Sequence, residues 1–139
     1  MKKVHNKKYL FSLWQALSFF ILLIFSPDYS FASEAREIYL KYRCIKCHSM
    51  KSENIEPLKE ELLKGKKIID HSGVGLEYDA EWLKKWLLKE VEKDGEKHRV
   101  KFKGSPQELD TLTRWLVEKK ERINPEEIRK WYREIIGRQ

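Results

Sequence analysis

Cysteine and methionine are both scarce in this sequence, and their scarcity narrows what the chain can be. The only two cysteines, Cys44 and Cys47, stand so close that a disulfide between them would close too small a loop to stabilise the chain much. Beyond Met1, the single methionine is Met50. The sequence also has no internal repeat, no low-complexity tract and no nucleic-acid-binding motif. These absences argue against a disulfide-stapled scaffold, a repeat protein and a nucleic-acid-binding protein.

Both cysteines belong to the pentapeptide Cys44-Ile45-Lys46-Cys47-His48. On one helical turn, positions i, i+3 and i+4 share a face, so the two sulfurs and the imidazole point the same way. The sulfurs can then bond to the edge of a haem while the imidazole reaches its iron, and C-x-x-C-H is typical of c-type haem attachment. We therefore expect one covalently attached haem c, held by Cys44 and Cys47, with His48 as an iron ligand.

Two other kinds of site also use closely spaced cysteines. A zinc site would need a fourth ligand, and structural zinc usually takes a second close pair of Cys or His, which this chain lacks. A thioredoxin-like C-x-x-C lies at a helix N-terminus within a βαβ pattern, and no strand-rich, alternating segment surrounds Cys44. Haem attachment is therefore the preferred interpretation.

Residues 1–32 have the pattern of an export leader. Four lysines precede an uncharged apolar run over residues 10–25, and the small residues Ser30 and Ala32 stand three residues before and immediately before Ser33. We expect a signal peptide cleaved before Ser33. The alternative is a retained membrane anchor, although the run is shorter than a full span of about 20 residues. Both interpretations place residues 33–139 outside the cytoplasmic membrane, in the periplasm or an equivalent extracytoplasmic space.

The segment 33–139 is about one small domain long. Without the four leader lysines and Asp28 it has 25 basic and 21 acidic side chains, a formal net charge of +4. This modest charge favours encounters with acidic redox partner proteins or with anionic lipid, and a membrane is expected as a partner only if the leader is retained. A chain this short and this charged buries a limited core, so a haem would supply much of the missing apolar surface.

Helical periodicity begins at Ser33, a possible N-cap, and leads directly into Cys44. The apolar positions of this first helix are Ala35, Ile38, Tyr39 and Tyr42. Residues 50–69 give a poor signal, which we interpret as a loop containing at most a short helix that Gly65 breaks. A second helix is expected from Asp79 to near Asp94-Gly95, whereas residues 98–102 alternate in polarity and are expected to be extended.

Two further helices have clear starting signals. Ser105-Pro106-Gln107-Glu108 combines an N-cap, a proline at the first position and a glutamate placed to complete a capping box. Asn124-Pro125-Glu126-Glu127 repeats that chemistry and opens a terminal helix. The expected buried positions of the last three helices are Trp82, Leu83, Trp86, Leu87, Val91, then Leu109, Leu112, Trp115, Leu116, then Ile128, Trp131, Tyr132 and Ile135. The sequence thus predicts an all-α fold.

This succession of features resembles the class I cytochromes c that carry a single haem. In that family an N-terminal helix leads into C-x-x-C-H, a glycine-containing loop and a middle helix follow, and a C-terminal helix crosses the first one. The segments that match in this order are Ile38-Tyr39, Gly73-Val74-Gly75, Glu81-Trp82-Leu83 and the stretch from Glu108-Leu109 to Trp115-Leu116. The resemblance covers roughly residues 34–119. It implies a helical wrap around the haem in residues 33–120, an additional helix in residues 121–139, and contact of Trp115 with Ile38 or Tyr39.

The sixth iron ligand departs from that family, which usually supplies a methionine from the loop before the C-terminal helix. Met50 follows His48 by only two residues and is therefore tied to the proximal side of the haem. His98 occupies the region where the methionine is expected, so we predict His98 as the distal ligand of a bis-histidine site. His71 is the rival ligand, although it stands where the family places an apolar haem contact. An open sixth position is the third alternative.

The resemblance and the ligand set together imply a function. We expect a one-electron carrier and not an enzyme, and we expect a low potential because imidazole gives a lower potential than a methionine ligand. Two alternatives remain. One is a gas-binding or sensor haem protein with an open or displaceable sixth position, and the other is an electron-transfer subunit of a larger oxidoreductase complex, docked through the terminal helix.

Overall fold

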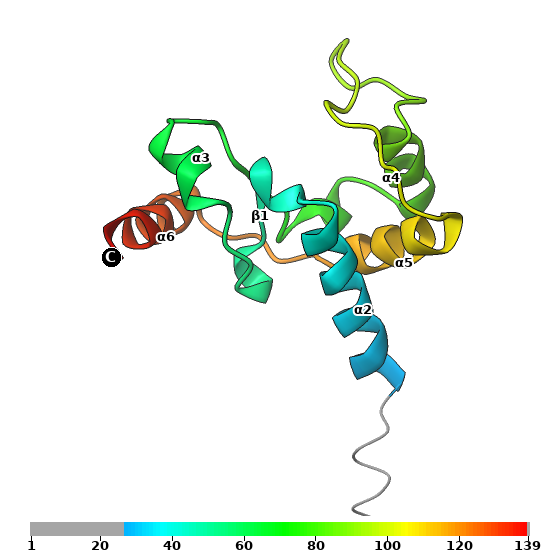
Figure 1. Cartoon of the computed structure of the whole chain (residues 1–139), viewed down its shortest axis with the longest axis horizontal. Coiled ribbons are helices and arrows are strands. Elements are labelled where there is room, and N and C mark those ends of the chain that lie inside the picture. The colour runs from blue at the N-terminus through cyan, green and yellow to red at the C-terminus, as the bar shows by residue number, and fades with distance from the viewer. Residues whose placement is uncertain (1–26, 139) are drawn as a thin grey trace, which may run out of the picture. The chain divides into compact units, whose positions relative to one another are not determined.

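The computed structural model describes residues 27–138, with side chains from residue 31, and these residues are mostly helical (Figure 1). The helices are α2 (Pro27–Lys41), α3 (Lys59–Leu63), α4 (Ala80–Leu87), α5 (Pro106–Val117) and α6 (Pro125–Gly137). Residues 32–139 form one compact unit. The predicted leader run over residues 10–25 lies outside the described residues. Among the helices described, none has the length and apolar character needed to cross a bilayer.

A short parallel ladder adds β structure to the predicted all-α fold. β1 (His48–Ser49) pairs with β2 (Ile69–Asp70), with His48 opposite Ile69. The Ile69 N–H donates to the Cys47 carbonyl at 3.0 Å, and the His71 N–H donates to the Ser49 carbonyl at 2.8 Å. Strands of two residues are too short to leave a periodic pattern in the sequence. The ladder places His71 beside the end of the C-x-x-C-H segment.

The N-terminal helix and the segment after the ladder differ in part from the sequence prediction. α2 begins at Pro27, so Ser33 lies inside the helix and is not its N-cap. Residues 50–69 contain α3, and Gly65 follows it in the left-handed region at φ 68°. A short 3-10 turn, η2 (Lys51–Glu53), precedes α3. The predicted loop with one short helix before Gly65 is therefore confirmed, apart from the ladder at its two ends.

The helix α4 begins as predicted and ends early. The Asp79 carboxylate accepts the Trp82 N–H at 2.8 Å, which caps the first turn. The helix stops at Leu87, and Lys89 follows in the left-handed region at φ 63°, so Val91 lies outside the helix. Asp94 and Gly95, both with positive φ, form a tight turn between Lys93 and Glu96. Residues 98–102 form no strand, contrary to the extended segment that the sequence predicted.

Helix α5 contributes more buried apolar side chains than any other described helix and packs against α4 (Figure 1). The predicted capping box is present, because Ser105 accepts the Glu108 N–H while the Glu108 side chain accepts the Ser105 N–H. The predicted buried positions of this helix, Leu109, Leu112, Trp115 and Leu116, are all buried. The Trp115 ring contacts Tyr39 of α2 edge to face, with ring centres 5.9 Å apart. The predicted crossing contact of Trp115 is thereby confirmed.

The glycine loop fits against the end of α5. It forms the 3-10 turn η3 (Val74–Leu76), and the Gly75 N–H donates to the Lys119 carbonyl at 2.8 Å. A Cβ on Gly75 would lie 2.1 Å from the Val117 carbonyl oxygen, closer than any real contact. This position therefore has no room for a side chain, which gives a physical reason for glycine there.

Helix α6 packs back onto the same unit. The Asn124 side chain accepts the Glu126 N–H at 2.8 Å, and Pro125 occupies the first position, as predicted. The helix lies against α3 (Figure 1), and Ile135 is buried. Lys51 forms an ion pair with Glu127 at 2.6 Å. The terminal helix is therefore held by contacts within the chain.

Candidate functional site

Cys44 opens a 3-10 turn, η1 (Cys44–Lys46), and Cys47 follows as its C-cap. Arg43 precedes the turn in the left-handed region at φ 55°, and the Cys47 N–H closes it by donating to the Cys44 carbonyl at 3.1 Å. In a 3-10 turn the side chains at i and i+3 eclipse, so the two sulfurs share a side. No disulfide joins them, and burial raises the pKa of the Cys44 thiol to about 12. The turn therefore presents two free thiols on one side, of which that of Cys44 is protonated.

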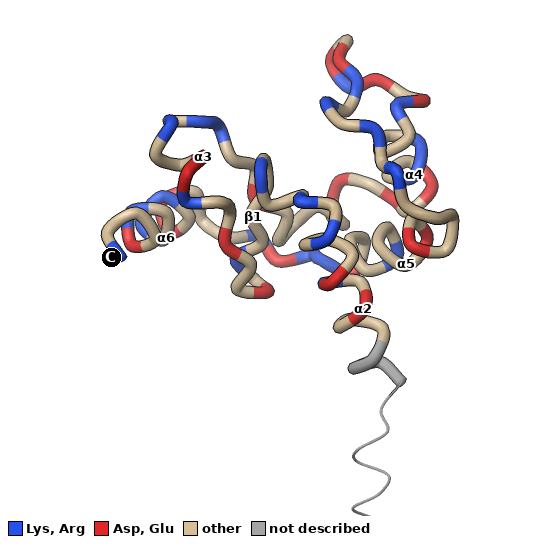
Figure 2. Tube along the Cα trace, in the orientation of Figure 1, with Lys and Arg blue, Asp and Glu red and all other residues tan. Residues whose placement is uncertain are grey.

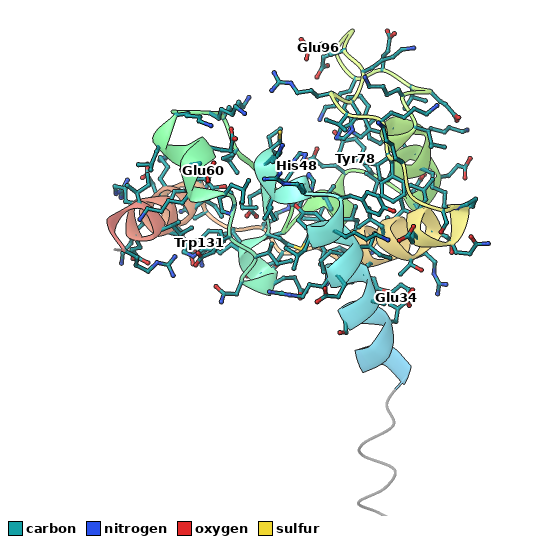
Figure 3. All side chains as sticks on the ribbon, viewed as in Figure 1. Glu34, His48, Glu60, Tyr78, Glu96 and Trp131 are labelled. Atoms are coloured by element: carbon teal, nitrogen blue, oxygen red, sulfur yellow. The ribbon has the colours of Figure 1, made fainter. Side chains whose placement is uncertain are left out.

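His48 follows immediately as the first residue of β1 and is part-buried; Figure 3 labels it. Burial lowers the pKa of its imidazole to about 4, the nearby His98 lowers it further, and a backbone interaction with Ile69 opposes both effects. That interaction falls short of a formed hydrogen bond, because the buried Nδ1 of His48 has no partner of acceptable geometry. At neutral pH the ring is uncharged and keeps a nitrogen lone pair for a metal.

His71 lies directly against His48. The two rings stack with centres 3.9 Å apart and planes 25° from parallel. The Tyr39 hydroxyl lies 3.3 Å from Nδ1 of His71, a long hydrogen bond from α2. Burial, with smaller effects from His48 and His98, holds the His71 pKa well below its usual range. The sequence predicted His71 only as a rival ligand, and the contact with His48 comes from the β1–β2 register.

His98 reaches the same place from a segment 50 residues further along the chain. Its ring centre is 6.3 Å from that of His48, and the two ring planes differ by only 12°. Its Nδ1 lies 2.6 Å from the Val100 carbonyl oxygen and donates to it, and the edge of Trp86 packs against the ring at 5.6 Å. Burial lowers the His98 pKa, partly offset by the Val100 hydrogen bond. The predicted pair His48 and His98 is thus brought together.

The distances separate the two rival ligands. A metal between two end-on imidazoles puts their ring centres about 6 Å apart, because each metal–nitrogen bond is about 2 Å and the ring centre lies about 1 Å behind the nitrogen. The 6.3 Å between the ring centres of His48 and His98 has the length of this spacing, whereas the 3.9 Å between those of His48 and His71 is too short for it. The ring planes are close to parallel in both pairs. The Val100 hydrogen bond also engages Nδ1 of His98, which leaves Nε2 as the nitrogen that could bind a metal.

Met50 is no candidate ligand in this arrangement. Its side chain is fully buried, with 0% of its surface exposed, and its backbone pairs with Ile55 in both directions at 2.9 Å. Within residues 27–138, no group of three or more His, Cys, Asp or Glu side chains is arranged to hold a bare metal ion. A haem iron would need fewer protein ligands than a bare metal ion, because the porphyrin already supplies four nitrogens. The imidazoles of His48 and His98 would supply the two further nitrogens that such an iron needs.

A part-buried polar network supports the β1–β2 ladder from the side of α6. The Ser49 hydroxyl donates to Asp70 Oδ2 at 2.6 Å and lies 2.6 Å from the Tyr132 hydroxyl. Asp70 also accepts the backbone N–H groups of Lys51 and Ser72, both at 3.0 Å. Ser49 and Asp70 are the chain neighbours of His48 and His71, so the network fixes the backbone that carries both rings. Sequence reasoning missed it, since these contacts span 21 and 83 residues.

Comparison with known proteins identifies no relative of this chain, so its function is argued from the geometry of the site. No family model matches the chain. No curated protein and no solved structure matches it either. The likeness to class I cytochromes c therefore stays a resemblance carried by the residues themselves, and the function is argued from the site.

Proposed function

We propose that this chain is an exported single-haem c-type cytochrome that carries one electron at a time, with His48 and His98 as axial iron ligands. The observation that carries the proposal is the approach of these two imidazoles to 6.3 Å with nearly parallel planes. Nothing in the local sequence brings them together, because 50 residues separate them. Their spacing suits one metal atom between them, and one of them directly follows the two thiols of a haem-attachment motif.

Each residue of the site has a distinct role in this proposal. Cys44 and Cys47 would each form a thioether by adding S–H across a vinyl group of the porphyrin. His48 and His98 would each give one nitrogen lone pair to the iron, with the Nδ1 of His98 turned to Val100. The bound haem would supply an iron that alternates between two oxidation states. The surrounding buried side chains of α2 and α5 would keep water away from the site.

The ligand pair sets the expected potential. Replacing the family's methionine by imidazole lowers the potential of a haem, and axial ligands shift haem potentials over about 0.8 V. A carrier with two imidazoles therefore belongs at the low-potential end. Met50 is withheld from the iron by its burial in the core. With an imidazole at each of the two remaining iron positions, we propose a carrier and not an enzyme.

The surface charge favours an acidic redox partner. Residues 84–103, which include His98, hold eight basic and four acidic side chains, an excess equal to the whole net charge of residues 33–139. Figure 2 shows the two signs interspersed along the loop that follows α4. A positive excess around the more exposed ligand would speed encounters with acidic proteins, and added salt would slow them.

The direct test is the mass of the protein after export. The chain expressed with its leader and a haem-attachment system should yield a periplasmic protein that begins at Ser33 and carries the mass of one haem. A denaturing gel stained for haem should show the same band. The matched control is the double variant Cys44→Ala, Cys47→Ala, which should be exported without retaining haem through denaturation. A processed wild-type chain without haem would overturn the proposal, and Met1 on a membrane-bound form would replace the cleaved leader by an anchor.

A gas-binding or sensor function is the second candidate, and the support of His98 favours it. Among its contacts within the described residues are one side-chain hydrogen bond and one aromatic edge, on a segment without helix or strand. Such a ligand is easier to displace than one built into a ladder. The absorption spectrum of the reduced protein with and without carbon monoxide separates the two functions. A carrier keeps its low-spin spectrum, whereas a sensor binds the gas at the sixth position.

A further inference from the structure

A ladder of aromatic rings leads from the surface of α4 to His98. Tyr78 and Trp82 stack with ring centres 4.1 Å apart and planes 19° from parallel. Trp82 and Trp86, one helical turn apart on α4, follow at 5.3 Å and 17°. Trp86 then meets His98 edge to face at 5.6 Å and 61°. Figure 3 labels Tyr78, the outer end of this ladder.

The row of aromatic rings is held from two sides, by the first turn of α4 and by the loop that leads to His98. On the α4 side, the Asp79 cap holds the first turn, from which Trp82 projects. On the loop side, the ammonium of Lys93 lies 4.9 Å from the Tyr78 ring centre and hydrogen-bonds to the Tyr78 hydroxyl. Lys93 flanks the Asp94-Gly95 turn, so the loop folds back onto the outer end of the ladder. The rings therefore form a braced stack.

His98 needs such a brace because its segment has no helix or strand that would fix the orientation of its ring. The Val100 hydrogen bond fixes the position of Nδ1 but leaves the ring free to turn about the line from Nδ1 through the ring. The edge contact of Trp86 blocks that rotation from one side. With both contacts in place, the ring plane lies within 12° of the plane of His48.

We propose that Trp86 is a positioning residue that holds the ring of His98 parallel to the ring of His48, braced by Trp82 and Tyr78. This inference rests on the proposed function, since parallel planes have a consequence only for a metal between the rings. Each imidazole interacts with the iron d orbitals that lie perpendicular to its own plane. Two parallel rings act on the same d orbital, so its energy moves far from that of its partner orbital. Two crossed rings act on different d orbitals, so the energies of the two orbitals stay close together. The ring angle is therefore read directly by electron paramagnetic resonance of the oxidised protein.

The experiment uses the haem-loaded full chain and compares variants of single aromatic residues. The wild type should give a strongly rhombic low-spin signal, as parallel rings require. Trp86→Leu should shift the largest g value upward while the signal stays low-spin, and Trp86→Phe, which keeps an aromatic edge, should restore most of the wild-type signal. Trp82→Leu, which removes only the brace, should give a smaller shift in the same direction. Trp131→Leu is the matched control, because Trp131 lies on α6 outside the row of rings from Tyr78 to His98, and the signal should stay unchanged.

The outcomes separate this inference from the proposed function. A rhombic low-spin signal that is identical in the wild type and Trp86→Leu overturns the positioning role while the bis-histidine assignment stands. A wild-type signal typical of crossed rings does the same. A wild type without haem, or with a high-spin iron, overturns the proposed function and this inference with it. If Trp86→Leu fails to fold, Trp82→Leu decides the matter: a shift in its largest g value supports the positioning role, and an unchanged signal overturns it.

Discussion

The two histidines proposed as iron ligands are supported in opposite ways. His48 follows the turn that carries both cysteines, stands in a backbone ladder and neighbours a hydroxyl–carboxylate network. His98 sits on a segment without regular structure and is held by a carbonyl and an aromatic edge. Segments with few backbone hydrogen bonds open at lower free energy than laddered ones. The chain therefore fixes one side of the site firmly and leaves the other side adjustable.

The largest effect is expected when each of the two rival sixth ligands, His98 and His71, is replaced in turn. His98→Ala should convert the iron of the haem-loaded protein from low-spin to a high-spin or ligand-accepting form, because the adjustable side then has no ligand. His71→Ala should leave the iron low-spin, since His71 stacks on the side of His48. Absorption spectra of both variants check this. An unchanged low-spin spectrum and potential in His98→Ala would move the sixth ligand to His71 or a lysine.

The firmly held side of the site, which carries His48 and His71, also depends on the glycine loop that follows His71. In Gly75→Ala the new Cβ would lie 2.1 Å from the Val117 carbonyl oxygen, so the loop and the end of α5 must separate. We expect a loss of about 1–3 kcal/mol of unfolding free energy, as for overpacked sites. Urea titration measures it. Gly137→Ala is the control. Apart from its chain neighbours and its own helix backbone, no described atom lies within 4 Å of the place that its Cβ would take, so the stability should barely change.

A smaller effect is expected from the network behind the ladder. Tyr132→Phe removes the hydroxyl that lies 2.6 Å from Ser49, whose side chain is fully buried. We expect a loss of about 1 kcal/mol, because Ser49 keeps its bond to Asp70. A double-mutant cycle with Ser49→Ala isolates the shared bond. If the two single effects simply add, α6 is not coupled to the ladder through this contact.

The smallest effect on stability is expected at the N-terminal cap of α5. This cap belongs neither to the support of His48 nor to that of His98, so it gives a reference for both. Lys41, the Ser105 backbone and Tyr42 lower the pKa of Glu108 to about 2, from an ordinary value of 4.5. A carboxyl whose pKa is lower in the folded state stabilises the fold above pH 4.5, and this stabilisation is lost as the pH falls towards 2. The gap in melting temperature between the wild type and Glu108→Gln should therefore shrink over this range. A gap that is constant with pH would show that the charge of Glu108 contributes nothing.

Local chemistry explains which parts of the fold the sequence predicts. The caps Asp79, Ser105 and Asn124 are correct because each acts on N–H groups two or three residues away. The buried face of α5 is correct because its helical period is regular and Trp115 is fully buried. The motif and its neighbouring histidine are likewise a local pattern, although η1 is a 3-10 turn and not an α-helical one.

The parts that could not be predicted depend on contacts between distant segments. The β1–β2 ladder joins residues 21 apart with strands too short to show a period. The early end of α4 depends on the left-handed Lys89, although the helical pattern continues to Val91. The place of His71 follows from the ladder register, and the role of Tyr132 follows from the packing of α6 on α3. Only the folded chain brings these groups together.

Tyr39 joins the core to the site, and this has a thermodynamic consequence. Its ring packs on Trp115 at 5.9 Å, and its hydroxyl reaches His71 at 3.3 Å. A ligand that binds only the ordered histidines thus favours the docking of α2 on α5, and for a free ligand that gain would fade on dilution. A haem bonded to Cys44 and Cys47 cannot be diluted away, because its effective concentration is set by the chain. The stability of such a protein would be independent of how much haem its surroundings hold.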